Sequence, residues 1–163
     1  MSIQEIISSL SLQPHPEGGY YKEVYRSATY IEQTSLPNNF TGKRNVSTSI
    51  YYLLQQGDFS AFHRIKSDEI WHYYHGDTAI IHMLFANGRY DHKLVGADLN
   101  KGAHFQVVIP AGVWFAAEPT GDFILAGCTV APGFDFSDFE LGNMQELRSQ
   151  YPQHTNLIER LCR

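Results

Sequence analysis

A histidine and a glutamate six residues apart are the residues of this sequence best suited to chemistry. The segment FHRIKSDEIWHYYHGD, residues 62–77, holds His63, Glu69 and, seven residues further, Gly76 ahead of an acidic turn. An imidazole beside a carboxyl group can exchange protons with a bound molecule, and either group can orient the other. Burying a carboxylate is costly unless something compensates it, so a functional site explains the pair better than a structural hydrogen bond does.

The same pair is a weak basis for a metal site. A transition metal held by protein normally needs at least three imidazole, carboxylate or thiolate ligands. His72 follows Glu69 by three residues, which on a strand places the two side chains on opposite faces unless a bulge intervenes. We therefore expect no metal and no other cofactor, with a divalent ion at His63 and Glu69 as the alternative.

A glycine pair near the N-terminus is flanked by charged residues that could bind a ligand. Glu17 precedes Gly18 and Gly19, and Arg26 follows at the end of a strand-like run. Arginine offers planar donors to carboxylate or phosphate, and glycine lets a backbone approach a ligand closely. Glu17 and Arg26 are therefore candidate ligand-binding residues, although an ion pair beside a turn explains them equally well.

Other polar and aromatic residues extend the set of candidate ligand contacts. Tyr51 or Tyr73 could supply a proton to the second face of a substrate. Trp114 could stack on a sugar or a base, with core packing as its alternative. Gln106 stands between apolar neighbours, where an inward amide would need a partner.

Short strands must position these side chains. Runs rich in Ile, Val, Tyr and Phe recur from Val46 to Val130, separated by turn signals such as Asn87-Gly88. Such a series predicts an all-β, antiparallel sandwich or barrel. The predicted strands cover roughly 46–55, 59–66, 69–75, 78–86, 89–96, 105–109, 113–117 and 122–130, after a first strand at 20–26.

Helices are expected only at the two ends of the chain. Ser2 and Glu5 have the spacing of a capping box at the start of an apolar helical pattern, which predicts a short N-terminal helix. Weak helical patterns near 143–150 and 155–161 predict short pieces that cover the barrel.

Composition restricts the class of protein. The 163 residues fit one domain, 1–163, and the net charge of −5 without a basic cluster excludes nucleic acid as an expected partner. No apolar run approaches the length of about 20 residues that spans a membrane. The chain has only Cys128 and Cys162, which we interpret as reduced thiols, and no secretory leader, so we expect a cytoplasmic protein.

Several motifs in order resemble one protein family. LQPHPEGGYYKEVYRS, SIYYLL, FHRIKSDEIWHYY, VIPAGVWFAA and CTVAPGFDF are together similar to the cupin_5 (DUF985) family of the cupin superfamily. The resemblance extends from about Leu12 to Phe139. It implies a double-stranded β-helix, or jelly-roll barrel, that is usually a homodimer, and some members resemble dTDP-sugar epimerases more than metal dioxygenases.

The two cupin motifs are incomplete in this chain. His63, Glu69 and Gly76 fall on the first His, the Glu and the Gly of the first motif, but Ile65 stands in place of its second His. In the second motif, PAGVWF places Phe115 where the last metal-binding His would stand. Part of the superfamily's usual ligand set is therefore missing.

These observations lead to a small-molecule-binding cupin with three functional hypotheses. The first is a metal-independent isomerase or epimerase acting on a sugar or sugar-nucleotide, in which His63 abstracts a proton and Glu69 orients it. The second is a ligand-binding module without catalysis. The third is a metal-dependent enzyme that uses His63 and Glu69.

Overall fold

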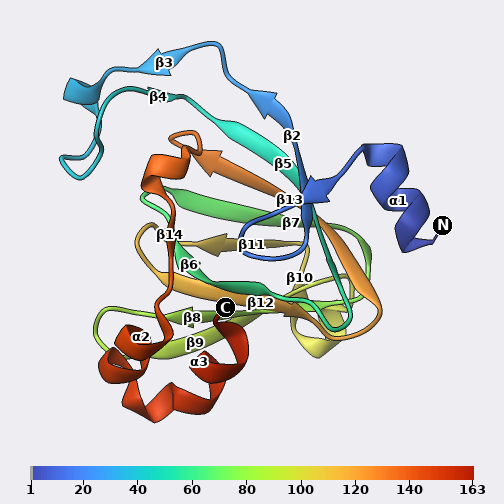
Figure 1. Ribbon diagram of the computed structural model, residues 1–163. Coiled ribbons are helices and arrows are strands. Elements are labelled where there is room, and N and C mark those ends of the chain that lie inside the picture. The colour runs from blue at the N-terminus through green and yellow to red at the C-terminus, as the bar shows by residue number, and fades with distance from the viewer. Residues whose placement is uncertain (1) are drawn as a thin grey trace.

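The computed structural model describes residues 2–163 and consists mainly of two six-stranded sheets that face each other (Figure 1). The first sheet contains, in spatial order, β1 (Gln13–Pro14), β2 (Tyr20–Arg26), β5 (Thr48–Gln55), β13 (Phe123–Ala131), β7 (Asp68–Gly76) and β11 (Gln106–Ile109). The second contains β10 (Ala103–His104), β9 (Tyr90–Val95), β8 (Ala79–Leu84), β12 (Trp114–Pro119), β6 (Ser60–Arg64) and β14 (Glu140–Leu141).

From β5 to β8 and again from β11 to β14, successive strands belong alternately to the two sheets, in the manner of a jelly roll. Pairing is antiparallel apart from the short β9–β10 contact, which is parallel. The all-β prediction is confirmed, and every predicted strand is present. The run predicted at 46–55 starts at Thr48. Five short strands were not predicted: β1, β10, β14 and the pair β3 (Tyr30–Ile31) and β4 (Arg44–Asn45).

The space between the sheets is filled by the inward side chains of alternate strand positions. Tyr52 of β5, Trp71 of β7, Ile81 of β8 and Phe115 of β12 are almost completely buried there. The same alternation points the intervening residues outward.

Helices cover the outer faces, as predicted (Figure 1). α1 (Ile3–Leu10) packs on the first sheet and has the expected capping box, in which Ser2 N donates to Glu5 Oε2 at 2.7 Å. α2 (Met144–Gln150) and α3 (Thr155–Leu161) pack on the second sheet. No helix within residues 2–163 is both long and apolar enough to cross a membrane.

A buried ion pair fixes an arm of the chain to the open end of the barrel. The arm contains η1 (Gln33–Ser35) and a two-stranded sheet of β3 (Tyr30–Ile31) and β4 (Arg44–Asn45). Arg44 makes a bidentate contact with Asp138 of η3 (Phe136–Asp138), at 2.6 and 2.7 Å, and both side chains are buried. The pair therefore holds the segment 134–139 against the barrel.

Removing the cation of this pair should destabilise the fold. Arg44→Met leaves the buried Asp138 carboxylate without its bidentate partner, for which we expect a loss of about 3 kcal/mol in unfolding free energy. Lys66→Met is the matched control, because Lys66 lies 3.5 Å from the same carboxylate but is partly exposed. Urea denaturation measures both. Equal, small losses in the two variants would contradict the importance assigned to Arg44.

Candidate functional site

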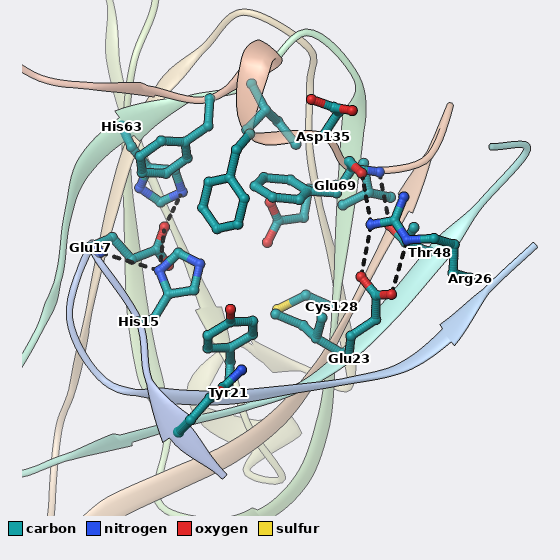
Figure 2. A pocket seen from close by; sticks show the side chains of 17 residues that line it. His15, Glu17, Tyr21, Glu23, Arg26, Thr48, His63, Glu69, Cys128 and Asp135 are labelled. Carbon is teal, nitrogen blue, oxygen red and sulfur yellow. Dashed lines mark hydrogen bonds and ion pairs between the residues drawn. The ribbon is translucent and has the colours of Figure 1, made fainter. Parts of the chain in front are cut away.

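A cavity of about 500 Å³ lies at the open end of the barrel, between the sheets and beneath the segment 134–139 (Figure 2). Its wall is formed by β2, β5, β6, β7 and β13 and by the loop that precedes β2. This volume lies in the usual range for small-molecule sites. The sequence predicted a pocket inside a barrel, and the cavity has this position.

An ion pair between a loop glutamate and a strand histidine forms one wall. His63 Nε2 lies 3.0 Å from Glu17 Oε2, while His63 Nδ1 donates to the carbonyl of Ala61 at 2.7 Å. The hydroxyl of Ser60 donates to the second oxygen of Glu17 at 2.9 Å. Glu17, His63 and Ser60 are all buried. Both ring nitrogens of His63 are thus engaged by the protein.

The two partners stabilise each other's charged forms. Burial by itself would raise the pKa of Glu17, but the charge and hydrogen bond of His63 lower it to about 2. Burial by itself would lower the pKa of His63, yet the charge and hydrogen bond of Glu17 raise it above the ordinary value. The pair therefore favours an imidazolium at His63 facing a carboxylate at Glu17.

The glycine that follows Glu17 allows the turn that places Glu17 in this position. Gly18 has φ +115°, and a Cβ added there would lie 2.0 Å from the carbonyl oxygen of Phe59. Only glycine fits such a turn. The buried hydroxyl of Tyr52 donates to the Gly18 carbonyl at 2.7 Å. Arg163 donates to the Glu17 carbonyl at 3.2 Å, so residues from both ends of the sequence fix the loop.

Glu69 is the second buried carboxyl group of the cavity. It projects inward from β7, where its Oε1 accepts the indole N–H of Trp71 at 2.7 Å. Its exposed fraction is 8%. Burial raises the pKa of Glu69 to about 7, with the nearby charge of His63 acting in the opposite direction and that of Glu17 adding to the rise. A carboxyl group that titrates near neutral pH can both take and give a proton.

His15 faces the cavity as a neutral ring. Its Nδ1 accepts the backbone N–H of Glu17 at 3.2 Å, which places the ring proton on Nε2. Burial lowers the pKa of His15, although Glu17 acts against this. Figure 2 shows its ring pointing into the cavity, beside Tyr21, whose ring centroid lies 4.6 Å away. His15 can therefore donate a hydrogen bond to a ligand.

The arginine at the cavity mouth is bound within the protein. Arg26 makes a bidentate contact with Glu23, at 2.9 and 2.8 Å, and also donates to Asn45 at 2.8 Å. A further bond reaches the carbonyl of Phe134 at 3.0 Å. Because its charge is paired with Glu23 and most of its N–H donors are bonded within the protein, Arg26 has little capacity left to bind an anionic ligand, the role considered for it from sequence.

The aromatic rings of the segment 134–139 cover the cavity. Phe134, Phe136 and Phe139 pack edge to face, with ring centroids 5.0 to 6.3 Å apart. All three rings line the cavity, so the segment FDFSDFE contributes an aromatic part of its wall.

The structure brings together only part of the predicted site. His63, Glu69, Glu17 and Arg26 all line the cavity. The remaining predicted ligand contacts do not line it: Tyr51, His72, Tyr73, Gln106 and Trp114. Their predicted role in ligand binding gains no support from their positions.

Three of these residues face away from the barrel interior. Tyr51 packs in the outer cluster beneath α1, and Gln106 is exposed on β11. His72 also points outward from β7, with Nε2 3.1 Å from Thr129 Oγ1, so it cannot join Glu69. Side chains three residues apart on a strand point to opposite faces, so His72 and Glu69 could not both bind one metal ion. This alternation accounts for the outward position of His72.

Tyr73 and Trp114 are packed into other parts of the core. Tyr73 faces inward, but its hydroxyl donates to the Gly76 carbonyl at 2.7 Å, away from the cavity wall. Trp114 lies on the outer side of β12 against α2 and α3, with the Arg64 guanidinium 4.4 Å from its ring centroid. The core-packing alternative for Trp114 agrees with this position.

Sequence reasoning missed His15 and Tyr21, which line the cavity together with Cys128. His15 lies in the segment HPEGGYY, and its position two residues before Glu17 and the glycine pair was the available signal. Tyr21 is an inward residue of a predicted strand, but the alternation alone did not separate it from Tyr20.

The residues of the cavity do not fit a metal of the usual cupin type. Within residues 2–163 no group of three or more His, Cys, Asp or Glu side chains is arranged to hold a metal ion. Ile65 is buried, and the ring of Phe115 packs 4.0 Å from that of His63. The Nε2 atom of His63 faces Glu17.

The facing sheets, the cavity at one barrel end and the positions of His63 and Glu69 define a protein of the cupin type. The chain belongs to the Cupin_5 family of the cupin superfamily (DUF985), whose model matches residues 4–142. It is similar to the crystal structure of protein SO0799 from Shewanella oneidensis, with 36% identity, a TM-score of 0.91, and coverage of 100% of this chain and 98% of that one.

Two further comparisons extend this picture. An uncharacterised protein of Saccharomyces cerevisiae, YML079W, is 34% identical over 84% of this chain and 73% of its own length. Oxalate decarboxylase of Bacillus subtilis has a TM-score of 0.56 at 15% identity, over 95% of this chain and 37% of that one. The last similarity shows the fold alone.

The charge state of His63 should depend on Glu17. In Glu17→Gln the burial of the ring remains while its negative partner is lost, so we expect the pKa of His63 to fall from above its ordinary value to below it. Two-dimensional ¹H–¹³C spectra across a pH series, with His63→Gln for assignment, measure this. Glu23→Gln is the control, because Glu23 lines the same cavity but pairs with Arg26. An unchanged titration in Glu17→Gln would contradict the ion pair.

Proposed function

We propose that this cupin is a metal-independent isomerase or epimerase that moves a proton on a small carbonyl compound of the sugar type, with Glu69 as the proton-transfer group. The observation that carries the proposal is a buried carboxyl group with a pKa of about 7 that faces a cavity of about 500 Å³. A proton-transfer group works best when its pKa lies near the working pH.

The geometry favours Glu69 over His63, the base assigned from sequence. A base needs a free lone pair, whereas both nitrogens of His63 contact the protein at 2.7 and 3.0 Å. One oxygen of Glu69 is bonded to Trp71, and the carboxyl group otherwise faces the cavity. We therefore assign His63 an electrostatic and positioning role.

The other cavity residues can complete the reaction. The neutral His15 Nε2–H donates a hydrogen bond to a carbonyl oxygen, while the Glu69 carboxylate takes the proton from the neighbouring carbon to give an enolate. The Tyr21 hydroxyl, which points into the cavity (Figure 2), is placed to return a proton from another side. Return to the same carbon gives an epimer. Proton exchange with solvent then restores the Tyr21 hydroxyl and the Glu69 carboxylate, and no electrons are gained or lost.

A ligand-binding module without turnover is the second candidate. It is favoured by the internal saturation of His63 and Arg26, which leaves few groups free for chemistry. In this case His15 and Glu69 bind the ligand through hydrogen bonds. Hydrogen exchange with solvent distinguishes the two candidates, because a binder does not labilise a carbon-bound proton.

Exchange into the substrate should depend on Glu69. In D₂O, we expect a panel of uncharged aldoses and amino sugars to include a compound whose carbon-bound proton exchanges, as followed by ¹H NMR. Glu69→Gln should slow this exchange about 10²- to 10⁴-fold. The rate should rise with pH through about 7, because Glu69 must be ionised to accept a proton.

The control is Glu118→Gln, which alters a carboxylate that pairs with Arg160 and His82 outside the barrel. Its exchange rate should match that of the unaltered protein. Exchange that survives in Glu69→Gln would reject the assignment. Ligand binding without exchange by any compound would favour the binding module.

We also propose that the protein is a cytoplasmic homodimer. Two chains would meet on the outer face of the first sheet, where Val24, Tyr74 and Val108 are exposed apolar side chains. Large exposed apolar side chains gathered on one sheet are typical of an interface.

A charge on this face should separate the chains. Val108 is 54% exposed, and Val108→Asp would bury an unpaired carboxylate in the interface, so we expect the sedimentation mass to fall from that of a dimer to that of a monomer. Leu99→Asp is the control, because Leu99 is 56% exposed in η2 (Leu99–Lys101), away from this face. A monomeric unaltered protein, or a dimeric Val108→Asp, would contradict the proposal.

A further inference from the structure

We infer that the cavity binds a small organic cation, a molecule that carries an ammonium group, and excludes phosphorylated molecules. Among sugars this class corresponds to an amino sugar and not to a sugar phosphate or sugar-nucleotide. The inference narrows the substrate class of the proposed function and rests on that function only for turnover, since binding can be measured alone.

The charges that line the cavity support a cationic ligand. Its cationic side chains are Arg26 and His63, and each is already paired with a glutamate of the same wall, Glu23 and Glu17. A phosphate would therefore find no free positive charge. It would also approach Glu69 and Asp135, which have no ion pair of their own, because the Arg44 and Arg26 charges that act on Asp135 are paired with Asp138 and Glu23. That approach costs free energy in a partly desolvated site.

The carboxylates that remain are Glu69 and Asp135. Among residues 2–163 neither forms an ion pair with a basic side chain; Asp135 instead accepts bonds from the backbone and hydroxyl of Ser137, at 2.8 and 2.6 Å. Glu69 is 8% exposed and accepts the Trp71 indole N–H. Among residues 2–163, the only other side chain that donates a hydrogen bond to Glu69 is Cys128, whose thiol is a weak donor. An ammonium group would supply the missing positive charge through a charge-assisted hydrogen bond or a close ion contact.

The aromatic wall fits the same ligand. Phe134 and Phe136 meet at an interplanar angle of 83°, and Phe136 and Phe139 at 72°, so the rings form a corner with more than one π face. Cations are attracted to such faces, and an aromatic wall beside a carboxylate is the usual receptor for alkylated ammonium groups. Phe136 is 53% exposed at the mouth, which a ligand would cover.

The test uses matched probes that differ in charge. Choline and its uncharged isostere 3,3-dimethylbutan-1-ol have the same shape, and inorganic phosphate tests an anion. The chain has only two tryptophans, so the indole N–H signals of Trp71, bonded to Glu69, and Trp114, outside the barrel, give a site reporter and an internal control.

We expect choline to shift the Trp71 signal saturably, with an affinity about 10-fold above that of the isostere, while Trp114 stays unchanged. This ratio corresponds to about 1.4 kcal/mol, the magnitude of one partly desolvated charge contact. Phosphate should shift neither signal. Equal affinities for choline and its isostere, or binding of phosphate at Trp71, would overturn the inference.

Two variants examine the origin of the preference. Glu69→Gln should lower choline binding to the level of the isostere, and Phe136→Leu, at an exposed position, should weaken choline several-fold while leaving the isostere nearly unaffected. Glu118→Gln should change nothing. Unaltered choline binding in both cavity variants would contradict the assigned contacts.

The outcomes also separate this inference from the proposed function. Binding of choline without hydrogen exchange by any sugar would reject the isomerase and retain the cation site. Exchange on an uncharged sugar by a protein without cation preference would reject the cation site and retain the isomerase.

Discussion

The buried ion pair of Glu17 and His63 is the interaction on which the rest of the cavity depends. It joins the loop before β2 to β6 and so closes one side of the barrel end. Two charges removed from water are tolerated only when their remaining hydrogen-bonding positions are satisfied, and here Ser60 and the Ala61 carbonyl satisfy them. Because His63 is neutralised by Glu17, its charge is only partly available to Glu69, whose pKa burial can then raise to about 7.

Contacts from distant parts of the sequence hold the loop before β2 and the segment 134–139 in place around this pair. Gly18 allows the close turn that presents Glu17, and Arg163 binds the same loop from the far end of the sequence. On the opposite side of the mouth, Arg44 and Asp138 hold the phenylalanine segment in place. The loops of the cavity are therefore fixed by buried or half-buried contacts and not by strand pairing, which gives the cavity a defined shape before any ligand arrives.

The sequence predicted the strands well but the cavity only in part, for reasons that individual residues make clear. Alternation along β7 separated Glu69 from His72 correctly, since only one face of that strand reaches the cavity. It could not decide between the two positions considered for Trp114, because α2 and α3 bury the outer face of β12 as thoroughly as the barrel buries its inner face. His15 lies in a loop, where no periodicity indicates direction, and its contacts depend on residues distant in the sequence.

The departures from the cupin metal motifs and the charge of the cavity have a common physical explanation. Ile65 and Phe115 stand where the superfamily's pattern has histidines, and the Nε2 atom of His63, which could otherwise bind a cation, faces the carboxylate of Glu17. Glu69 keeps its motif position without a positive partner of its own. A protein can hold such a carboxyl group either by protonating it, which its raised pKa allows, or by binding a cation beside it. Proton transfer uses the first state and recognition of an ammonium group uses the second, so both proposals draw on one desolvated carboxyl group.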